Sequence, residues 1–266
     1  MNDAAVLVDG VVVRYGDFEA VRGVSFSVEQ GDVFGLLGPN GAGKTSTLRV
    51  LTTLMRPSAG RALVAGHDTV RESLSVRAAI GYVPQAISVD AALTGRENLD
   101  FYARVAGVPR REQSARVDHA VAAMQLESFV GRLARELSGG MLRRLEVATA
   151  VLTRPRVLFL DEPTVGLDPT ARRLVWDRLL ALREEEGTTL VVTTHLMEEA
   201  ERYCERLAIM DFGRLAAQGT PASLREDFGA ASLDDVFAAA TGHELAEQGG
   251  GFRDVRRQRR LSRRLG

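Results

Sequence analysis

The fold of this chain is decided by residues 38–45, which read Gly-Pro-Asn-Gly-Ala-Gly-Lys-Thr (GPNGAGKT). The spacing of its glycines, Lys44 and Thr45 is that of a phosphate-binding loop. Glycines let backbone N–H groups approach phosphate oxygens, Lys44 brings an ammonium group to the β and γ oxygens, and Thr45 offers a hydroxyl to Mg²⁺. The stretch predicts a nucleoside triphosphate site. Its predicted binding residues are Gly38, Pro39, Asn40, Gly41, Ala42, Gly43, Lys44, Thr45 and Ser46.

The flanking sequence provides the structural context that such a loop requires. Residues 33–37 form an apolar run typical of a buried strand, and they lead directly into the glycines. Residues 45–54 then show the apolar spacing of a helix, which Pro57 and Gly60 close. Strand, loop and helix follow in the required order, so a simple glycine-rich turn is the weaker explanation.

The remaining patterns predict an α/β fold. Runs rich in β-branched and aromatic residues at 11–13 and 24–28 indicate an N-terminal sheet. Helical patterns dominate residues 90–152, beginning with the capping-box pattern of Thr94 and Glu97. Strand-like and helical runs then alternate up to residue 210, which indicates a parallel sheet covered by helices.

We therefore expect a P-loop NTPase core with three additions: an N-terminal antiparallel β subdomain, an inserted helical subdomain over about residues 90–152, and a small C-terminal extension. The expected nucleotide-binding domain covers residues 1–220. The extension covers residues 221–266, starts with the helix-capping pair Thr220-Pro221 and ends in an Arg-rich tail.

Two adjacent carboxylates, Asp161 and Glu162, follow the apolar run 157–160. Ligands of α/β proteins bind outside the carboxyl ends of the strands. Because successive side chains of an extended chain point to opposite faces, we expect Asp161 to hold Mg²⁺ through water and Glu162 to act as general base or to orient the attacking water. A strand ending in Asp-Glu is by itself as often a structural edge, but the phosphate-binding loop favours the catalytic interpretation.

A second glycine-containing turn, Leu-Ser-Gly-Gly at 137–140, narrows the choice of enzyme. Together with the phosphate-binding loop and the two acids, it makes residues 5–220 resemble an ABC-type ATPase. The other motifs of the resemblance are Tyr15, Gln85 in GYVPQ, Asp168 in GLD and His195 in TTH. The turn departs from the commonest family pattern at Met141, where Gln is usual. We expect activity to be kept, because Ser138 and the backbone N–H groups still bind phosphate.

The resemblance explains why one chain has two anion-binding turns. In this family two nucleotide-binding domains face each other head to tail, and each ATP lies between the phosphate-binding loop of one and the Ser-Gly-Gly turn of the other. Ser138, Gly139 and Gly140 would thus bind the γ-phosphate of a partner's ATP. Alone, such a turn before a helix is more often a plain N-cap. The implied partner is a second copy of the chain or a similar ATPase subunit.

The resemblance also assigns roles to the other motif residues. Tyr15 would stack on adenine, unless it is an ordinary strand aromatic. Asp168 belongs to a loop that crosses the dimer interface, although alone it reads as a helix N-cap. Gln85 would contact Mg²⁺ or the attacking water, and His195 would bind the γ-phosphate and hold Glu162 and the water. The implied catalytic residues are Glu162, His195 and Lys44, the metal ligands are Thr45, Gln85 and Asp161, and the cofactors are ATP and Mg²⁺.

Composition limits where the protein acts. The single cysteine, Cys204, excludes an internal disulfide and favours an intracellular compartment. The N-terminus does not resemble a secretory signal, and no apolar run approaches the roughly 20 residues that cross a bilayer. Residues 251–266 hold seven arginines against Asp254, so they carry +6 of the net −1 and leave −7 on residues 1–250. We therefore expect no nucleic-acid partner.

An ATPase that dimerises and separates is useful when another part moves with it. The resemblance implies an integral membrane permease subunit on a separate polypeptide, which docks beside Gln85 and the helical insert. We expect the chain in the cytoplasm, peripheral on the inner face of the cell membrane. The motifs and SLDDVFAAATGHE at 232–244 resemble ATPase subunits of the daunorubicin-resistance type of exporter. This implies export of a drug, antibiotic or lipid-like cargo.

Two other classes stay open at this point. A soluble ABC ATPase of DNA repair or translation usually has long insertions or two sets of motifs, whereas here ~100 residues separate Gly38 from Ser138. A small-molecule kinase would leave Ser138, Glu162 and His195 without a role. The Arg-rich tail is explained either by binding to anionic lipid or as a solvated tail.

Overall fold

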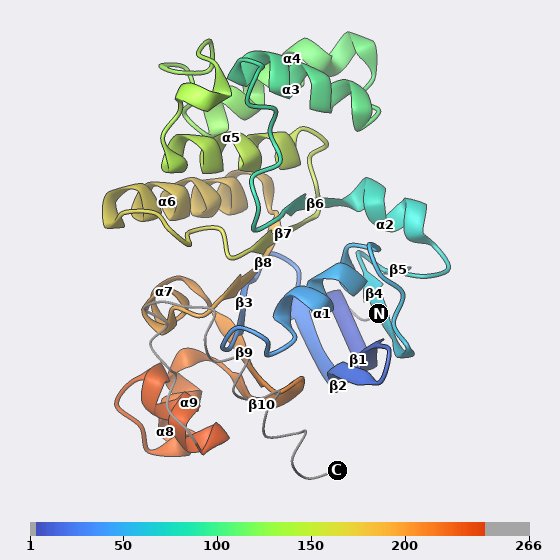
Figure 1. Cartoon of the computed structure of the whole chain (residues 1–266), viewed down its shortest axis with the longest axis vertical. Helices are drawn as coiled ribbons and strands as arrows, with labels where there is room; N and C mark the ends of the chain where they lie inside the picture. Colours follow the sequence, from blue (N-terminus) through green and yellow to red (C-terminus); the bar gives the residue numbers. More distant parts are fainter. Residues whose placement is uncertain (1–3, 243–266) are drawn as a thin grey trace.

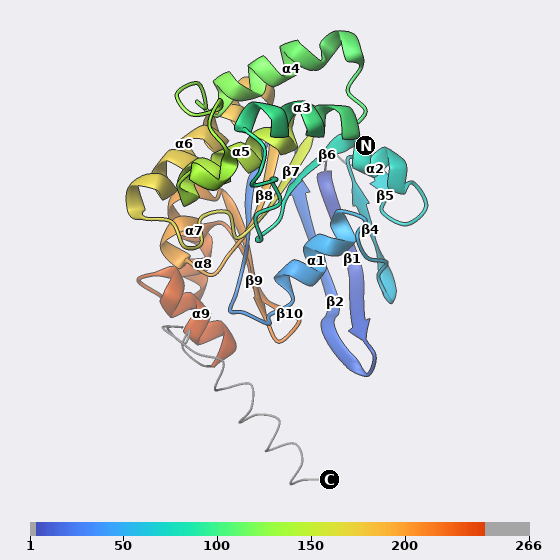
Figure 2. The same ribbon diagram turned by 45° about the horizontal axis from the view of Figure 1, so that its top comes forward.

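The computed structural model describes residues 4–242 and contains two β-sheets with helices packed around them (Figures 1 and 2). The predicted Arg-rich tail lies outside the described residues. The strands are β1 (Ala4–Tyr15), β2 (Phe18–Glu29), β3 (Val33–Leu37), β4 (Ala59–Val64), β5 (His67–Asp68), β6 (Ile80–Val83), β7 (Val157–Asp161), β8 (Thr189–Thr194), β9 (Arg206–Asp211) and β10 (Arg214–Gly219). The α-helices are α1 (Lys44–Leu51), α2 (Ser73–Ala79), α3 (Gly95–Val105), α4 (Arg110–Ala123), α5 (Gly139–Val151), α6 (Pro169–Glu186), α7 (Met197–Tyr203), α8 (Pro221–Phe228) and α9 (Leu233–Thr241).

The central sheet has the strand order β10-β9-β3-β8-β7-β6. Its strands β9, β3, β8, β7 and β6 are parallel, and β10 adds an antiparallel edge. Every residue of β3, β7 and β8 is buried, as expected for parallel strands that are covered on both faces. The predicted parallel sheet is confirmed.

Alternation along β7 determines which way its last side chain points. Leu158 and Leu160 belong to the core cluster on the side of α3 to α9. Val157 and Phe159 belong to the other cluster, which contains α1 and the antiparallel sheet. Because side chains in a strand repeat every two residues, Asp161 lies on the α1 side. It therefore faces the helix that follows the phosphate-binding loop.

The second sheet is antiparallel, with the order β2-β1-β4-β5, and α1 lies between it and the central sheet (Figure 2). The rings of Phe26 and Phe34 stack with centroids 5.2 Å apart and join the two sheets. The predicted N-terminal antiparallel subdomain is confirmed, but its strands are longer than expected and β4 was not expected. The sequence of β4, AGRALV, has a single β-branched residue, and the strand forms because it pairs with β1.

The helical subdomain, α3 to α5, lies against α6 beyond the β6 edge of the central sheet (Figure 1). The capping box expected at its start is present, because Thr94 Oγ1 accepts a hydrogen bond from the Glu97 N–H and the Glu97 carboxylate accepts one from the Thr94 N–H. In the C-terminal extension, Thr220 caps α8 with Pro221 in the first turn. The fold class is confirmed, whereas the domain boundaries near residues 90, 152 and 220 stay predictions.

Gly38, which joins β3 to the phosphate-binding loop, has no room for a side chain. Its φ is 146°, and a Cβ placed there would lie 2.1 Å from the carbonyl oxygen of Met210 in β9. The loop thus leaves the sheet in contact with the backbone of the neighbouring strand.

We expect Gly38→Ala to lower the free energy of unfolding more than the control Gly31→Ala. Gly31 also has a positive φ, 79°, but no atom lies within 4 Å of the point that an added methyl group would occupy. Gly31→Ala should therefore lower the free energy of unfolding by about 1–2 kcal/mol, because of backbone strain. Gly38→Ala should lower it by about 1–3 kcal/mol more, because of overpacking against β9. Urea denaturation measures both losses, and equal values would contradict the close approach to β9.

Candidate active site

The phosphate-binding loop forms one wall of a pocket of about 220 Å³ at the carboxyl ends of the central strands. Residues 39–46 line it, together with Gln85 and Glu162 from the neighbouring loops and Tyr15 and Phe18 from the antiparallel sheet. Chain segments that are far apart in the sequence therefore meet at one place. Gly38 is not among the described lining residues, because it lies behind the loop, against β9.

The ammonium group of Lys44 is buried at the base of this pocket. Its Nζ donates hydrogen bonds to the carbonyl oxygens of Gly38, at 2.7 Å, and Pro39, at 3.2 Å. Nζ also lies 3.3 Å from Oε1 of Glu162. Burial lowers the pKa of Lys44, and the charges of Glu162 and Asp161 oppose that shift. The loop thus holds its cation in place by hydrogen bonds to its own backbone.

Asp161 ends β7 with its carboxylate buried beside two hydroxyl groups. Thr45 Oγ1 donates to Oδ1 of Asp161 at 3.2 Å, and Thr193 Oγ1, from β8, donates to the same atom at 2.6 Å. Hydroxyl and carboxylate oxygens are the donors that Mg²⁺ prefers. The predicted pair of Thr45 and Asp161 therefore fits this ion in kind and in proximity.

Glu162 occupies a left-handed backbone conformation, with a φ of 48°. Its N–H donates to the hydroxyl oxygen of Thr193 at 2.9 Å. Such a conformation is uncommon outside glycine and is concentrated at functional sites. The expectation of simple alternation after Asp161 is therefore wrong. The backbone turns after the strand and brings the Glu162 carboxylate to Lys44, on the same side as Asp161.

Two further side chains approach the Glu162 carboxylate. Nδ1 of His195, in the loop after β8, lies 3.3 Å from Oε1, and Nε2 of Gln85, in the loop after β6, donates to Oε2 at 3.2 Å. Burial alone would raise the pKa of Glu162, but the interactions with His195 and Lys44 outweigh it and lower the pKa. The carboxylate is thus ionised at neutral pH and able to accept a proton from water.

Two aromatic rings flank the pocket where β1 turns into β2. Tyr15 and Phe18 pair across this turn, and their side chains are 42% and 60% exposed. The hydroxyl of Tyr15 lies 3.3 Å from Oγ of Ser46. An exposed ring beside a phosphate-binding loop can stack on a flat base. Phe18 was not predicted from the sequence. The available signal was the two-residue stretch Gly16-Asp17, which is typical of a hairpin turn and would pair Phe18 with Tyr15.

The Ser-Gly-Gly turn lies elsewhere on the chain. Among the described residues that line the loop pocket, neither Ser138 nor the two following glycines appears. Ser138 is exposed and caps α5, with its Oγ accepting from the Met141 N–H at 3.4 Å. Asp168 caps α6 in the same way, through the N–H groups of Thr170 and Ala171. The capping roles that the sequence allowed for both residues are therefore present.

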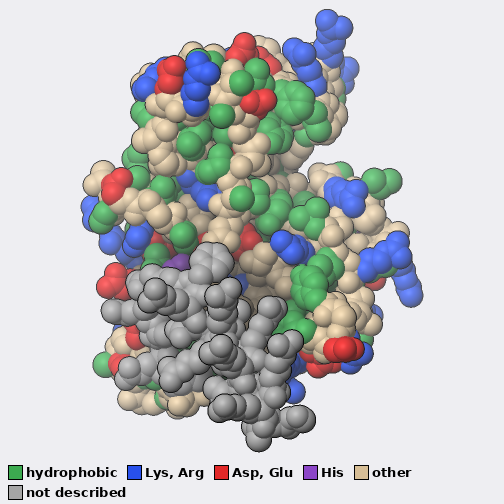
Figure 3. Space-filling model, in the orientation of Figure 1, with side chains coloured by type: hydrophobic (Ala, Val, Ile, Leu, Met, Phe, Trp, Pro, Cys, Tyr) green, Lys and Arg blue, Asp and Glu red, His purple; other side chains and the backbone are tan. Residues whose placement is uncertain are grey.

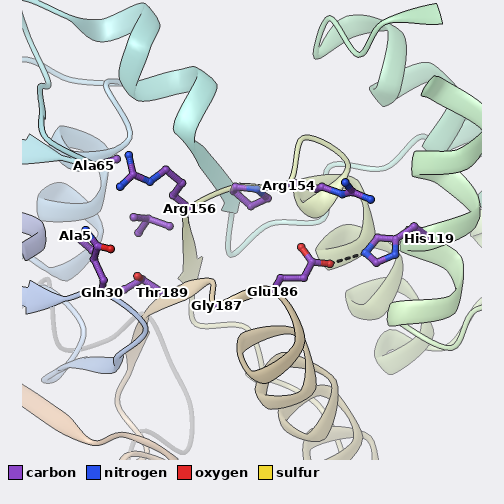
Figure 4. Close-up of a pocket in the computed structure, with 11 residues that line it drawn as sticks. Ala5, Gln30, Ala65, His119, Arg154, Arg156, Glu186, Gly187 and Thr189 are labelled. Carbon is purple, nitrogen blue, oxygen red and sulfur yellow. Dashed lines mark hydrogen bonds and ion pairs between the residues drawn. The ribbon is translucent and has the colours of Figure 1, made fainter. Parts of the chain in front are cut away.

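A larger pocket, of about 480 Å³, lies at the opposite end of the central strands (Figure 4). It is lined by the start of β7, the start of β8 and a pair formed by His119 and Glu186, whose Nε2 and Oε1 atoms lie 2.5 Å apart. None of the predicted site residues is among those that line it within residues 4–242. The predicted catalytic residues Lys44 and Glu162 line the smaller pocket instead.

The fold and the arrangement of these residues match known proteins. A family model described as ABC transporter matches residues 21–165. The chain belongs to the ABC transporter family. The daunorubicin resistance ATP-binding protein DrrA3 of Streptomyces coeruleorubidus is 45% identical over 240 residues, which cover 90% of this chain and 76% of that protein. The Nod factor export ATP-binding protein I of Paraburkholderia xenovorans is 46% identical over 224 residues, covering 84% and 73%.

Solved structures of ABC proteins have the same fold. An ATP-binding subunit of an ABC transporter superimposes with a TM-score of 0.79 at 28% identity, covering 89% of this chain and 99% of that one. CbiO1 from Clostridium perfringens, described as part of the ABC transporter complex cbiONQ, has a TM-score of 0.77 at 29% identity, with 86% and 92% covered. The predicted resemblance is confirmed, and the chain is an ABC-type ATPase.

Thr193, which the sequence did not reveal, contacts both acids of this ABC protein. Its hydroxyl donates to Asp161 and accepts from the Glu162 N–H, so one side chain orients both acids. The signal was weak, since Thr193 reads as a β-branched residue of a buried strand.

We expect Thr193→Val to lower the ATPase kcat about 10- to 100-fold, as for other residues that orient ligands. Binding of ATP should change less, because the phosphate-binding loop is untouched. The matched control is Thr189→Val, in the same strand, which loses a single hydrogen bond from the Gly31 N–H. Steady-state kinetics separates kcat from KM, and an equal loss in both variants would mean that Thr193 has a structural role alone.

Proposed function

We propose that this chain is the ATP-binding and ATP-hydrolysing subunit of an exporter, and that it works through a separate permease in the membrane. One observation carries the proposal. The chain has a phosphate-binding loop in its pocket, and a second glycine-containing turn, at Ser138 before α5, that does not line that pocket among the described residues. The two halves serve one nucleotide when two copies face each other head to tail.

The pocket supplies the half of the site that does the chemistry. The backbone N–H groups of residues 39–46 and the start of α1 bind the phosphates, and Lys44 replaces its own carbonyl contacts with the β and γ oxygens. Tyr15 stacks on the adenine. Glu162 accepts the proton of the attacking water, while Gln85 and His195 hold the carboxylate and the water in line with the γ-phosphate.

Thr45 and Asp161 are the groups that would hold Mg²⁺, with Gln85 as a further ligand. When bound, the ion neutralises charge that develops on the phosphate oxygens. Thr193 keeps the Asp161 carboxylate oriented toward Thr45. Mg²⁺ takes one or two carboxylates and fills its other positions with phosphate oxygens and water, so a single carboxylate at this place suffices.

The exposed turn supplies the second half. The free N–H groups at the start of α5 and the Ser138 hydroxyl would bind the γ-phosphate of the ATP that a second copy holds. A bacterial ABC transporter cassette with a TM-score of 0.71 and 25% identity, with 81% of this chain and 98% of that one covered, has been solved as a dimer. The dimer with ATP bound between its two copies is called the clamp here. After hydrolysis the clamp loses the γ-phosphate contacts that hold the copies together, and they separate.

The permease would dock on α3, close to the loop that carries Gln85. Phe101 and Val105 of this helix are 53% and 68% exposed, and Ile87 in the loop is exposed as well. Hydrophobic side chains gather over the part of the surface where α3 and α4 lie (Figure 3). Exposed apolar patches mark protein or membrane contacts. A movement of Gln85 at the active site would thus reach the permease directly.

Within residues 4–242 the helices lack the length and apolar character that crossing a bilayer demands. We propose that the chain is held at the cytoplasmic face of the membrane through the permease. The names of the relatives, which concern daunorubicin resistance and Nod factor export, support export of a drug-like or lipid-like cargo.

We expect Glu162→Gln to bind ATP, to turn over very slowly and to accumulate ATP-bound dimers, because the γ-phosphate then persists in the clamp. Adding Ser138→Arg should abolish these dimers and leave ATP affinity nearly unchanged. Light scattering measures the dimer, and equilibrium binding measures affinity. An equal loss of binding with Ser138→Arg would show that both turns serve one nucleotide within one chain, and a Glu162→Gln protein that stays monomeric in ATP would contradict the clamp.

We expect Phe101→Glu to lose copurification with the proposed permease, the membrane protein that is its partner, and to keep its basal ATPase activity. The control is Phe212→Glu, which changes another exposed aromatic residue, at the turn between β9 and β10. The control should still copurify with the membrane protein. Loss in both variants, or in neither, would contradict docking on α3.

A further inference from the structure

Helix α5 carries a buried ion pair that the proposed mechanism does not use. Nη1 of Arg143 lies 3.0 Å from Oε2 of Glu146, and the two residues are 5% and 1% exposed. Burial lowers the pKa of Arg143 and raises the pKa of Glu146, so the environment opposes both charges. A buried ion pair is often no more stabilising than an apolar pair of the same volume. The presence of the pair is therefore weak evidence of a stabilising role.

The pair holds the backbone of one particular loop. Arg143 donates from Nη1 to the carbonyl oxygen of Pro84 at 2.7 Å and from Nη2 to that of Gln85 at 2.9 Å. Oε1 of Glu146 accepts from the N–H of Ser88 and from its hydroxyl, the latter at 3.0 Å. The loop that carries Gln85 is thus attached to α5 at two places, at Pro84 and Gln85 and again at Ser88.

The same helix and the same loop each end at one half of an ATP site. The N-terminus of α5 is the Ser138 turn, about 7.5 Å of helix from Arg143 at 1.5 Å per residue. The side chain of Gln85 contacts the carboxylate of Glu162. Ser138, Arg143, Gln85 and Glu162 therefore form a continuous path between the turn that would bind a partner's ATP and the general base of the chain's own ATP.

We propose that Arg143 and Glu146 are positioning residues that couple the two ATP sites of the dimer. Binding of the γ-phosphate of the partner's ATP to the Ser138 turn would restrict the position of α5. The ion pair, which holds the backbone at Gln85, would then restrict the position of Gln85 and of the Glu162 carboxylate that it contacts. Each site then reaches full hydrolytic geometry after the other is clamped. The inference rests on the proposed function, because it requires two shared sites.

The double variant Arg143→Met and Glu146→Leu tests this coupling, because it leaves neither charge buried alone. We expect it to bind a nonhydrolysable ATP analogue with a Kd within about twofold of the wild type, and to dimerise with ATP in a Glu162→Gln background. In the Glu162 protein its kcat should fall at least about tenfold. Dimerisation without hydrolysis is the signature of uncoupling.

The matched control is Arg144→Met in the same helix. Arg144 stacks on Phe129 and donates to the carbonyl oxygens of Met124 and Gln125, so these contacts stay within the helical subdomain. The Arg144→Met variant should retain the kcat of the wild type. A wild-type kcat in the double variant would overturn the proposal, and so would joint loss of dimer and hydrolysis, because the pair would then shape the docking surface instead.

Should the double variant fail to fold, Arg143→Lys decides. A lysine keeps the charge beside Glu146, but its single ammonium cannot reproduce the planar fork that bridges two carbonyl groups. Arg143→Lys should still dimerise with ATP in the Glu162→Gln background, and its kcat should fall by less than that of the double variant. An unchanged kcat would overturn the coupling. A wild-type chain that neither hydrolyses ATP nor dimerises as Glu162→Gln would instead contradict the proposed function itself.

Discussion

The contact between Lys44 and Glu162 is the constraint on which the rest of the site depends. Two opposite charges are buried at the carboxyl end of a sheet that is itself buried on both faces. Each charge needs partners there, because an isolated ion in such surroundings is costly. The carbonyl groups of the loop, His195 and Gln85 provide them. A phosphate group that enters the pocket would replace Glu162 as the ionic partner of Lys44. The Glu162 carboxylate could then interact with the attacking water.

Much of the fold could be predicted because its signals are local. The glycines before Lys44, the capping box at Thr94 and the pair Thr220-Pro221 each determine a turn or a helix start within a few residues. The edge strands were harder. β10 reads RLAAQG, without a β-branched residue, and it is a strand because β9 offers it a hydrogen-bonding partner. The local sequence of β10 does not show that this partner is present, so its pattern alone could not predict a strand.

The site was predictable as a set of residues but not as a geometry. Motif spacing indicated Lys44 and Glu162, yet periodicity along β7 could not show that the chain turns left-handed after Asp161. Thr193 and Arg143 escaped notice for the same reason. Each reads locally as an ordinary strand or helix residue, and its role follows from partners 32 and 58 positions away. Long-range pairing of this kind leaves no periodic trace in a sequence.

The close packing of α5 against α6 has a consequence for how such a molecule can vary. A methyl group added at Gly140 would lie 2.7 Å from the Cβ of Ala171, so the smallest possible change wedges the two helices apart. The position of the exposed turn therefore depends on the small size of both residues at this contact. Ala171 is not among the residues proposed to bind the nucleotide, so a change of its side chain would shift the exposed turn through packing alone.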